Sequence, residues 1–288
     1  MPGLIDRLKS GEILISDGAM STLLQGMGLH SGAYPEEWNV TNPEAVASVY
    51  RAYIDAGSDL ICTNTCGGNP IKLDRYGVAS RAEEFNAASV RLAKQEAGER
   101  VLVAASIGPT GHLLEPLGEL PPEAAEAAFK IQADAVAAAG ADAILFETFF
   151  DLTEIEAGIK AALPTGVPII CTMTFDANGR TVMGVDAATA ARALIDLGAN
   201  VIGSNCGIGP DAMLPVVEAM ATTGAYIMVQ PNAGLPKVVG GQTTYDVTPE
   251  QMAEYAKQFV DAGARIVGGC CGSTPEHIAA IAKAVRSA

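Results

Sequence analysis

The chain has 288 residues, of which 49% are hydrophobic, and its formal net charge is −15 at pH 7. No apolar run approaches the roughly 18 residues that a membrane-spanning helix needs, and the N-terminus lacks a basic segment followed by an apolar secretory stretch. The negative charge repels phosphate backbones and anionic membrane surfaces. We therefore expect a cytoplasmic protein whose partners are neither nucleic acids nor membranes.

Eight apolar segments have the length and composition of buried parallel strands, and segments with helical patterning separate and follow them. The expected strands lie near residues 12–19, 58–65, 101–108, 143–148, 168–175, 201–206, 226–232 and 265–271. Eight alternations over this length favour a (β/α)8 TIM barrel over a doubly wound sheet, which usually has five or six strands and a dinucleotide loop. No break in composition interrupts the pattern, so we expect a single domain over residues 1–288.

Several of the expected helices have recognisable starts. Three begin where a side chain that can cap a helix precedes proline, a residue well suited to the first helical position. These pairs are Asn42-Pro43, Thr248-Pro249 and Thr274-Pro275. Ser80 and Glu83 have the spacing of a capping box, which predicts a fourth start.

A short phrase recurs four times, with a glycine between the end of an expected helix and the start of an expected strand. The four copies are Asp55–Ile61, Ala138–Ile144, Asp196–Ile202 and Asp261–Val267. Glycine ends a helix readily because it adopts the left-handed conformation without steric cost. The phrase therefore indicates a repeating strand–helix unit.

Polar and reactive residues gather where the strands are expected to end, whereas the strand bodies are apolar. Barrel enzymes carry their chemistry at the C-terminal ends of the strands. The residues at these positions include Asp17, Asn64, Ser106, Glu147, Asp176, Cys206, Asn232, Cys270 and Cys271. Cys206 on the sixth strand and the cysteine pair on the eighth should therefore converge at one mouth of the barrel.

Six cysteines in 288 residues are too few for a disulfide scaffold, and clustered cysteines in a cytoplasmic chain more often indicate metal binding or catalysis. Cys270 and Cys271 are adjacent, and a disulfide between neighbours requires strained geometry. Flanking glycines would let both thiols reach one ion. A three-thiolate zinc site with Cys206 is the favoured interpretation, and buried structural cysteines or redox thiols are the alternatives.

The other three cysteines are expected to have lesser roles. Cys62 and Cys171 lie inside expected strands and are interpreted as core residues. Cys66 lies at the rim but is not counted among the ligands.

A zinc ion held by three thiolates has a net charge of −1 and is a weak Lewis acid for splitting water. It can accept a fourth thiol and keep it as the thiolate at neutral pH, because metal binding lowers the pKa of a thiol. The pattern therefore favours transfer of an alkyl group to a thiol over hydrolysis.

Other rim residues match the needs of an amino-acid thiol. Glu147 could pair with an ammonium group or bond to local backbone, and Asp17, followed by Gly18 and Ala19, could face a carboxylate through backbone amides or only form a turn. Asn232 is a candidate polar contact or oxygen ligand. Three further side chains have non-catalytic or open interpretations: His112 as a loop residue, His277 as a helix cap and Trp38 as a lid or a packing residue.

These motifs together resemble those of the homocysteine S-methyltransferase family, and most of all the N-terminal homocysteine-binding barrel of cobalamin-dependent methionine synthase. The likeness extends over nearly the whole chain. It rests on Ser16–Thr22, Thr63–Thr65, Ile107–Gly111, Leu114–Gly118, Glu147-Thr148, Gly203–Gly207, Pro231–Gly234 and Gly268–Gly272. The separated Asn-Cys-Gly and Gly-Gly-Cys-Cys-Gly motifs are its most specific part.

The resemblance implies that Cys206, Cys270 and Cys271 bind catalytic zinc and that the sulfur of homocysteine takes the open position. Asn232 matches a position that can occupy this fourth site before the substrate arrives. The implied reaction is methyl transfer to homocysteine, which gives methionine.

The resemblance also implies how the amino acid is held. Glu147 and the turn Asp17-Gly18-Ala19 are expected to bind its ammonium and carboxylate groups. The folate, cobalamin and reactivation domains of methionine synthase do not follow this barrel in the 288 residues. The expected methyl donor is therefore methylcobalamin on a separate corrinoid protein, or a small molecule.

Three alternatives remain from the sequence. In the first, the donor is S-methylmethionine, betaine or another onium compound, for which Trp38 could contribute an aromatic surface. The second hypothesis is a non-catalytic docking module for a corrinoid protein, in which zinc only links strands six and eight. A redox thiol protein is the third hypothesis.

Cys66 stands where many relatives have an aromatic residue, so we expect the donor side of the site to differ in shape.

Overall fold

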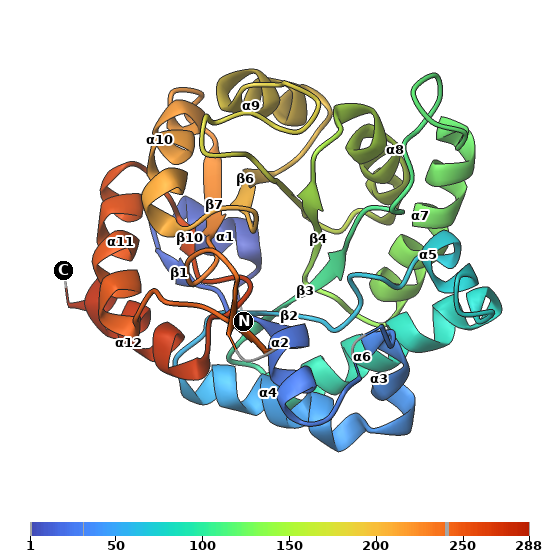
Figure 1. Ribbon diagram of the computed structural model, residues 1–288, viewed down its shortest axis with the longest axis horizontal. Helices are drawn as coiled ribbons and strands as arrows, with labels where there is room; N and C mark the ends of the chain where they lie inside the picture. Colours follow the sequence, from blue (N-terminus) through green and yellow to red (C-terminus); the bar gives the residue numbers. More distant parts are fainter. Residues whose placement is uncertain (1, 31, 240–241, 288) are drawn as a thin grey trace.

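A computed structural model describes residues 2–30, 32–239 and 242–287, and their fold is a single barrel of eight parallel strands (Figure 1). The strands are β1 (Leu14–Ile15), β2 (Leu60–Cys62), β3 (Leu102–Ile107), β4 (Ala143–Phe149), β5 (Ile169–Met173), β6 (Val201–Asn205), β7 (Tyr226–Gln230) and β10 (Ile266–Val267). They pair in the order β1-β10-β7-β6-β5-β4-β3-β2. A parallel bridge between Ser16 and Leu60 closes the circle. The predicted (β/α)8 TIM barrel is confirmed.

Eight helices surround the strands (Figure 1). They are α4 (Pro43–Asp55), α6 (Ala82–Ala97), α7 (Pro122–Ala138), α8 (Leu152–Ala162), α9 (Ala187–Asp196), α10 (Pro210–Ala221), α11 (Pro249–Asp261) and α12 (Pro275–Arg286). Along the described part of the chain, no helix is both long and apolar enough to cross a membrane.

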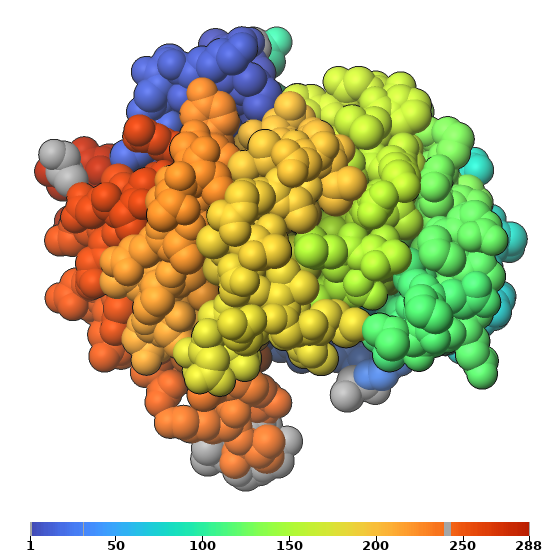
Figure 2. All heavy atoms as spheres, turned by 90° about the horizontal axis from the view of Figure 1, so that it is seen from above, coloured from blue at the N-terminus to red at the C-terminus, as the bar shows by residue number. Residues whose placement is uncertain are grey.

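Shorter elements lie in the connections. They are α1 (Leu4–Lys9), α2 (Met20–Gly26), α3 (Trp38–Thr41), α5 (Pro70–Asp74) and the 3-10 turns η1 (Pro35–Glu37), η2 (Ala79–Arg81) and η3 (Leu163–Thr165). An antiparallel hairpin of β8 (Lys237–Val239) and β9 (Gln242–Thr244) follows β7. The orange segment that contains it projects from the body, on the side away from the blue N-terminal segment (Figure 2).

The predicted helix starts are confirmed in part. Thr248 forms a complete capping box with Gln251, and the backbone N–H of Thr274 donates to Nδ1 of His277 at 3.1 Å. The side chain of Asn42 makes no capping bond, although its helix begins at Pro43 as expected. The predicted box at Ser80 is wrong, because that residue lies in η2 and α6 begins only at Ala82.

Side chains that point into the barrel form two layers of different character. The lower layer is apolar, and two leucines of α1 close it at the N-terminal end of the strands. It contains Leu4, Leu8, Leu14, Leu60, Leu102, Leu145, Ile170, Val201, Met228 and Ile266. Because side chains alternate along a strand, the next inward positions toward the C-terminal ends form an upper layer. That layer is polar and consists of Ser16, Ser106, Glu147, Thr172, Asn205 and Gln230.

The recurring glycine phrase has a clear structural role, because it forms a reciprocal clamp between neighbouring strands. The backbone N–H of Asp59 donates to the carbonyl of Ile15 at 2.7 Å, and the Asp59 carboxylate accepts the Ile15 N–H at 2.9 Å. The same two bonds, each 2.8 Å long, join Asp142 to Val103 and Asn200 to Ile169. In the fourth copy Arg265 keeps only the backbone bond, to Ile227 at 2.9 Å.

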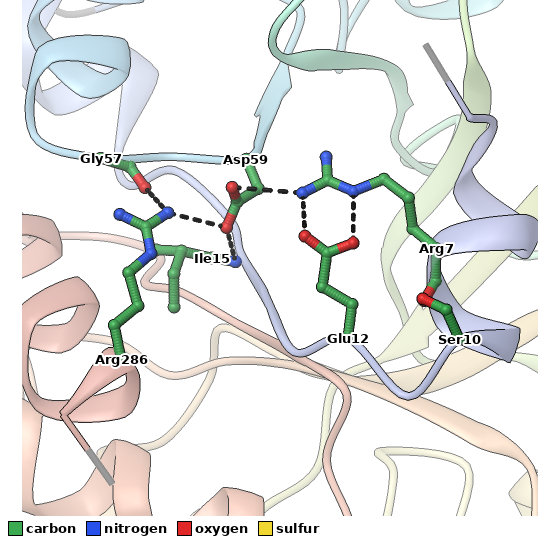
Figure 3. Close-up of polar contacts among 7 residues, drawn as sticks. All are labelled: Arg7, Ser10, Glu12, Ile15, Gly57, Asp59 and Arg286. Atoms are coloured by element: carbon green, nitrogen blue, oxygen red, sulfur yellow. Dashed lines mark hydrogen bonds and ion pairs between the residues drawn. The ribbon is translucent and has the colours of Figure 1, made fainter.

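Asp59 also ties both chain ends to the seam between β1 and β2 (Figure 3). Its carboxylate pairs with Arg7 of α1 at 3.3 Å and with Arg286 of α12 at 3.0 Å. Arg7 in turn pairs with Glu12, with a bond of 2.8 Å from Nε. The seam, which has only one strand bridge, is thus reinforced by a side-chain network.

Replacement of Asp59 by alanine is expected to lower the free energy of unfolding by about 1–3 kcal/mol, because it leaves the buried Ile15 N–H without a partner. Urea unfolding measures this loss. Asp59→Asn is the matched control, since an asparagine already forms the same clamp at Asn200 but lacks the charge that pairs with Arg7 and Arg286. Equal losses in the two variants would show that the clamp is not what Asp59 contributes.

Candidate metal centre and its cavity

The three predicted cysteine ligands lie together at the C-terminal mouth of the barrel. Cys206 directly follows β6, and Cys270 and Cys271 follow β10. Their sulfur atoms all lie within 4.8 Å of one another, and the sulfurs of Cys206 and Cys271 are 3.9 Å apart. Within the described ranges, no other group of three side chains has metal-binding spacing.

Local backbone geometry holds these thiols in place. Cys206 has a φ of 58°, a left-handed conformation that is uncommon outside glycine and is found mainly where function requires it. Its N–H donates to the carbonyl of Gln230 at 3.0 Å. The Cys270 N–H donates to Pro231 at 2.8 Å, and the Cys271 carbonyl accepts the Ala233 N–H at 2.9 Å. Both cysteine segments are therefore anchored to the end of β7.

The cluster concentrates negative charge. Hydrogen bonds from the thiols of Cys206 and Cys270 lower the pKa of Cys271 to about 3. The bond with Cys206 raises the pKa of Cys270 well above its ordinary value, as expected when neighbouring thiols share one charge. Three soft donors around one negative charge form a suitable environment for a soft or borderline cation.

A cavity of about 240 Å³ adjoins the cysteines. Asp17, Glu147 and all three clustered cysteines line it, so the structure brings most of the predicted site residues together. Of the described residues that line it, none is a lysine, arginine or histidine. A ligand in this cavity therefore meets carboxylates and thiols and no cationic side chain.

Glu147 reaches the cavity from an irregular part of β4. The register between β4 and β5 shifts between Phe146 and Phe149, and Thr148 has a φ of 66°. Such a bulge redirects side chains. The Ser106 hydroxyl donates to Glu147 Oε1, and the Asn205 amide donates to Oε2 at 3.3 Å. Burial raises the pKa of Glu147 above its ordinary value, although the bond from Ser106 lowers it in part.

Asp17 is almost fully buried beside the same cavity. Its Oδ2 accepts the backbone N–H of Cys62 at 2.7 Å, and its Oδ1 accepts the Ser16 hydroxyl at 3.4 Å. Gly18 and Ala19 also line the cavity. The Ala19 N–H already donates to Ser273 at 3.2 Å, so this amide has a protein partner rather than a free position.

Burial raises the pKa of Asp17 from 3.8 to about 7. Because the pKa of Asp17 is higher in the folded than in the unfolded protein, protonation of Asp17 stabilises the fold. This stabilisation is complete below about pH 4 and is lost as the pH rises through about 7. Asp17→Asn is therefore expected to give a flatter stability profile over this range and a more stable protein at pH 8. Urea unfolding at pH 5 and pH 8 tests this, and parallel profiles for the two proteins would contradict it.

Asn232 is placed differently from the other predicted residues. It does not line the cavity, and it is 4% exposed. Its Oδ1 has no hydrogen-bond partner among the described residues. The residues on either side of it, Pro231 and Ala233, bond to the backbone of Cys270 and Cys271. The unpaired oxygen of Asn232 therefore lies in the short segment whose backbone anchors the cysteine pair.

The remaining predictions have mixed outcomes. Cys171 is a core residue as predicted. Cys62, the last residue of β2, packs against the lower core layer as predicted but also lines the cavity together with Cys66. Trp38 packs against the core and does not line the cavity. His277 caps α12 as expected, with Nε2 2.9 Å from the Val247 carbonyl.

Sequence reasoning missed the supporting residues of the site. Asn205 bonds to Thr148, to Glu147 and, at 2.8 Å, to Thr172. Tyr245, just beyond β9, packs so closely on Gly272 that a Cβ there would lie 2.1 Å from the tyrosine ring. Asn205 was detectable as an inward position at a strand end. Tyr245 carries no such signal, since its hairpin is not part of the barrel repeat.

Comparison with known proteins identifies the class to which this barrel belongs. The sequence pattern of the homocysteine S-methyltransferase family matches residues 14–285, and the chain is a member of that family. The resemblance inferred from the motifs is thereby confirmed.

Two curated relatives are the methionine synthases of Mycobacterium tuberculosis and Mycobacterium leprae. They are 32% and 31% identical to the chain over 99% and 95% of its length. The chain spans only about a quarter of each, namely 25% and 24%. The metallated crystal structure of the homocysteine methyltransferase MmuM from Escherichia coli is also similar. It has a TM-score of 0.81 and 26% identity and covers 96% of this chain and 97% of its own.

Proposed function

We propose that the protein transfers a methyl group to the thiol of homocysteine, giving methionine, in a zinc-dependent reaction. The observation that carries this proposal is the cluster of Cys206, Cys270 and Cys271 beside a cavity that also presents Asp17 and Glu147. Membership of the homocysteine S-methyltransferase family supports it.

The donor set fits zinc. Zinc–thiolate bonds of about 2.3 Å in a tetrahedron place sulfur atoms about 3.8 Å apart, close to the 3.9 Å between Cys206 and Cys271. Three protein ligands leave one position for a substrate, whereas a structural zinc site usually has four. The unpaired Oδ1 of Asn232 is a suitable occupant of that position in the absence of substrate.

Zinc, when bound, would supply a Lewis acid that keeps a thiol deprotonated at neutral pH. The protein's own residues then act by positioning. Glu147 would hold the ammonium group of homocysteine, and the Asp17-Gly18-Ala19 turn would bind the amino-acid end of the substrate. Fixing the amino-acid end of a short substrate directs its sulfur toward the cysteines and lowers the entropic cost of the reaction.

The reaction itself is a displacement at the methyl carbon. A bond forms between the homocysteine sulfur and the methyl group, while the bond between methyl and its carrier breaks and both electrons stay with the carrier. Methionine is a neutral thioether and a weaker ligand than the thiolate it replaces, which favours its release.

The proposed donor is methylcobalamin on a separate corrinoid protein. The segments that follow β3, β5 and β7 at the C-terminal end of the barrel carry large exposed apolar side chains. They are Leu113, Leu117, Val182, Leu235 and Val238, with exposures of 42%, 67%, 85%, 57% and 78%. Because these loops lie at the same end of the barrel as the cavity, their apolar side chains are available for contact with a protein donor.

A small onium donor is the second candidate. The cavity has no cationic side chain among its described lining residues and contains two carboxylates beside the thiols. Such surroundings also attract a sulfonium or quaternary ammonium compound.

A methyl-transfer assay tests the proposal and separates the donors. Methionine formation from homocysteine is measured with methylcobalamin, S-methylmethionine and betaine separately, with and without a chelator. Activity that chelation removes while the circular dichroism of the barrel persists supports a catalytic metal, whereas unfolding on chelation would support a structural staple. No methionine from any donor, together with no homocysteine binding, would overturn the proposal.

A further inference from the structure

Gln230 is a polar residue of the upper barrel layer whose hydrogen bonding is incomplete. It ends β7, lines the cavity and is 4% exposed. Its Nε2 donates to the Ser16 hydroxyl oxygen at 3.0 Å. Its Oε1 is buried and has no partner in the part of the chain that is described. An unpaired buried carbonyl is unfavourable, so its presence at a cavity indicates an acceptor for a ligand.

The neighbouring bonds determine which amide atom is free. The Ser16 hydroxyl donates its only proton to Asp17 Oδ1 at 3.4 Å, so its oxygen is an acceptor toward Gln230. The amide nitrogen of Gln230 therefore faces Ser16. The free atom is the carbonyl oxygen, which needs a donor from the cavity.

Gln230 is also linked through neighbouring side chains to both carboxylates. It is the register partner of Asn205 on β6, and Asn205 donates to Glu147. On the other side, Ser16 links it to Asp17. The backbone carbonyl of Gln230 accepts the N–H of Cys206, which places the residue next to the metal centre.

We propose that Gln230 Oε1 accepts one N–H of the substrate's ammonium group, so that Asp17, Glu147 and Gln230 together recognise a primary ammonium. Such a group carries three N–H donors that point in different directions. Two carboxylates balance its charge, and a neutral amide supplies a third acceptor without adding a further negative charge. The inference rests on the proposed binding of homocysteine and extends it to a requirement for the α-amino group.

The test measures binding of two thiols to the zinc-loaded protein by calorimetric titration. One is L-homocysteine, and the other is 4-sulfanylbutanoate, which has the same chain but no ammonium group. Gln230→Met nearly conserves volume and removes the acceptor, and Gln230→Glu keeps an acceptor at this position. Zinc content and thermal unfolding of each variant are measured alongside.

We expect Gln230→Met to weaken homocysteine binding by about tenfold, the size expected for one hydrogen bond to a charged group. Binding of 4-sulfanylbutanoate should change less than about twofold, because this thiol has no ammonium group to lose a hydrogen bond. Gln230→Glu, which keeps an acceptor, should retain homocysteine binding. Equal weakening for both thiols, or none for homocysteine, overturns the assignment of Gln230. If Gln230→Met does not fold, weakened homocysteine binding in Gln230→Leu with restoration in Gln230→Glu supports the assignment, and its absence refutes it.

Failure of this inference is distinguishable from failure of the proposed function. If the parent protein binds homocysteine and the Gln230 variants bind it equally well, only the role of Gln230 is refuted. If the zinc-loaded parent protein binds no homocysteine, the proposed function itself is refuted.

Discussion

Cys206→Ser is expected to reduce both the zinc content and the rate of methyl transfer while the barrel remains folded. Serine offers a hard oxygen of high pKa in place of a soft thiolate, and only two thiolates would remain. Mutation of a residue that only hydrogen-bonds to a metal ligand typically lowers metal affinity or activity by about 10–100-fold. Loss of a ligand itself should therefore lower zinc affinity and the methyl-transfer rate by more than about 100-fold. Metal analysis after dialysis and single-turnover kinetics measure the two effects.

The fold should survive because the anchoring bonds of Cys206 are made by its backbone, with Gln230 at 3.0 Å and Ile208 at 2.7 Å. Cys171→Ala is the matched control, since that thiol is fully buried in the core and distant in role from the cavity. It should lose stability but retain zinc. Unchanged zinc content and turnover in Cys206→Ser would remove this thiol from the site.

Glu147→Gln is expected to lower kcat/KM for homocysteine by about 10–100-fold, which corresponds to the loss of about 1.5–3 kcal/mol from a hydrogen bond to a charged group. Glutamine conserves the shape of the side chain and its contact with Ser106 but removes the negative charge that faces the ammonium group. Zinc content should be unchanged. Steady-state kinetics with varied homocysteine measure the effect.

Glu154→Gln provides the comparison for this variant. Glu154 is also a buried carboxylate of the same barrel, but it accepts bonds from the Thr110 backbone and hydroxyl at 2.7 and 2.6 Å and does not line the cavity. Its replacement should lower stability and leave the KM for homocysteine unaltered. Similar kinetic losses in both variants would indicate a general effect of buried charge rather than substrate binding by Glu147.

Much of the architecture follows from local sequence signals. The glycine phrase marks strand starts because it combines a helix stop with an acceptor that bonds to the preceding strand, as Asp59, Asp142 and Asn200 do. The convergence of Cys206 with Cys270 and Cys271 also follows, since strand ends of a barrel share one mouth. These features depend on chain order and periodicity, which a sequence displays directly.

Other features depend on contacts between distant residues and leave no local pattern. The bulge at Thr148 is stabilised from another strand, because the Thr148 N–H donates to the Asn205 side chain at 2.8 Å. The capping box predicted at Ser80 failed because the 3-10 turn η2 occupies that segment before α6 begins. Cys62 was assigned only to the core because the expected strand continued to residue 65, whereas β2 ends at Cys62, beside the cavity.

The reciprocal clamps divide the barrel into strand–helix–strand quarters, and the candidate site is distributed unevenly among them. Asp17 and Glu147 come from the first two quarters, whereas Cys206, Cys270 and Cys271 come from the last two. One half-barrel therefore carries the metal ligands and the other carries the carboxylates expected to hold the amino acid. Asp59, in the first quarter, pairs with Arg286 of α12, in the last, at 3.0 Å, so an ion pair at the opposite end of the barrel from the candidate site links the two half-barrels.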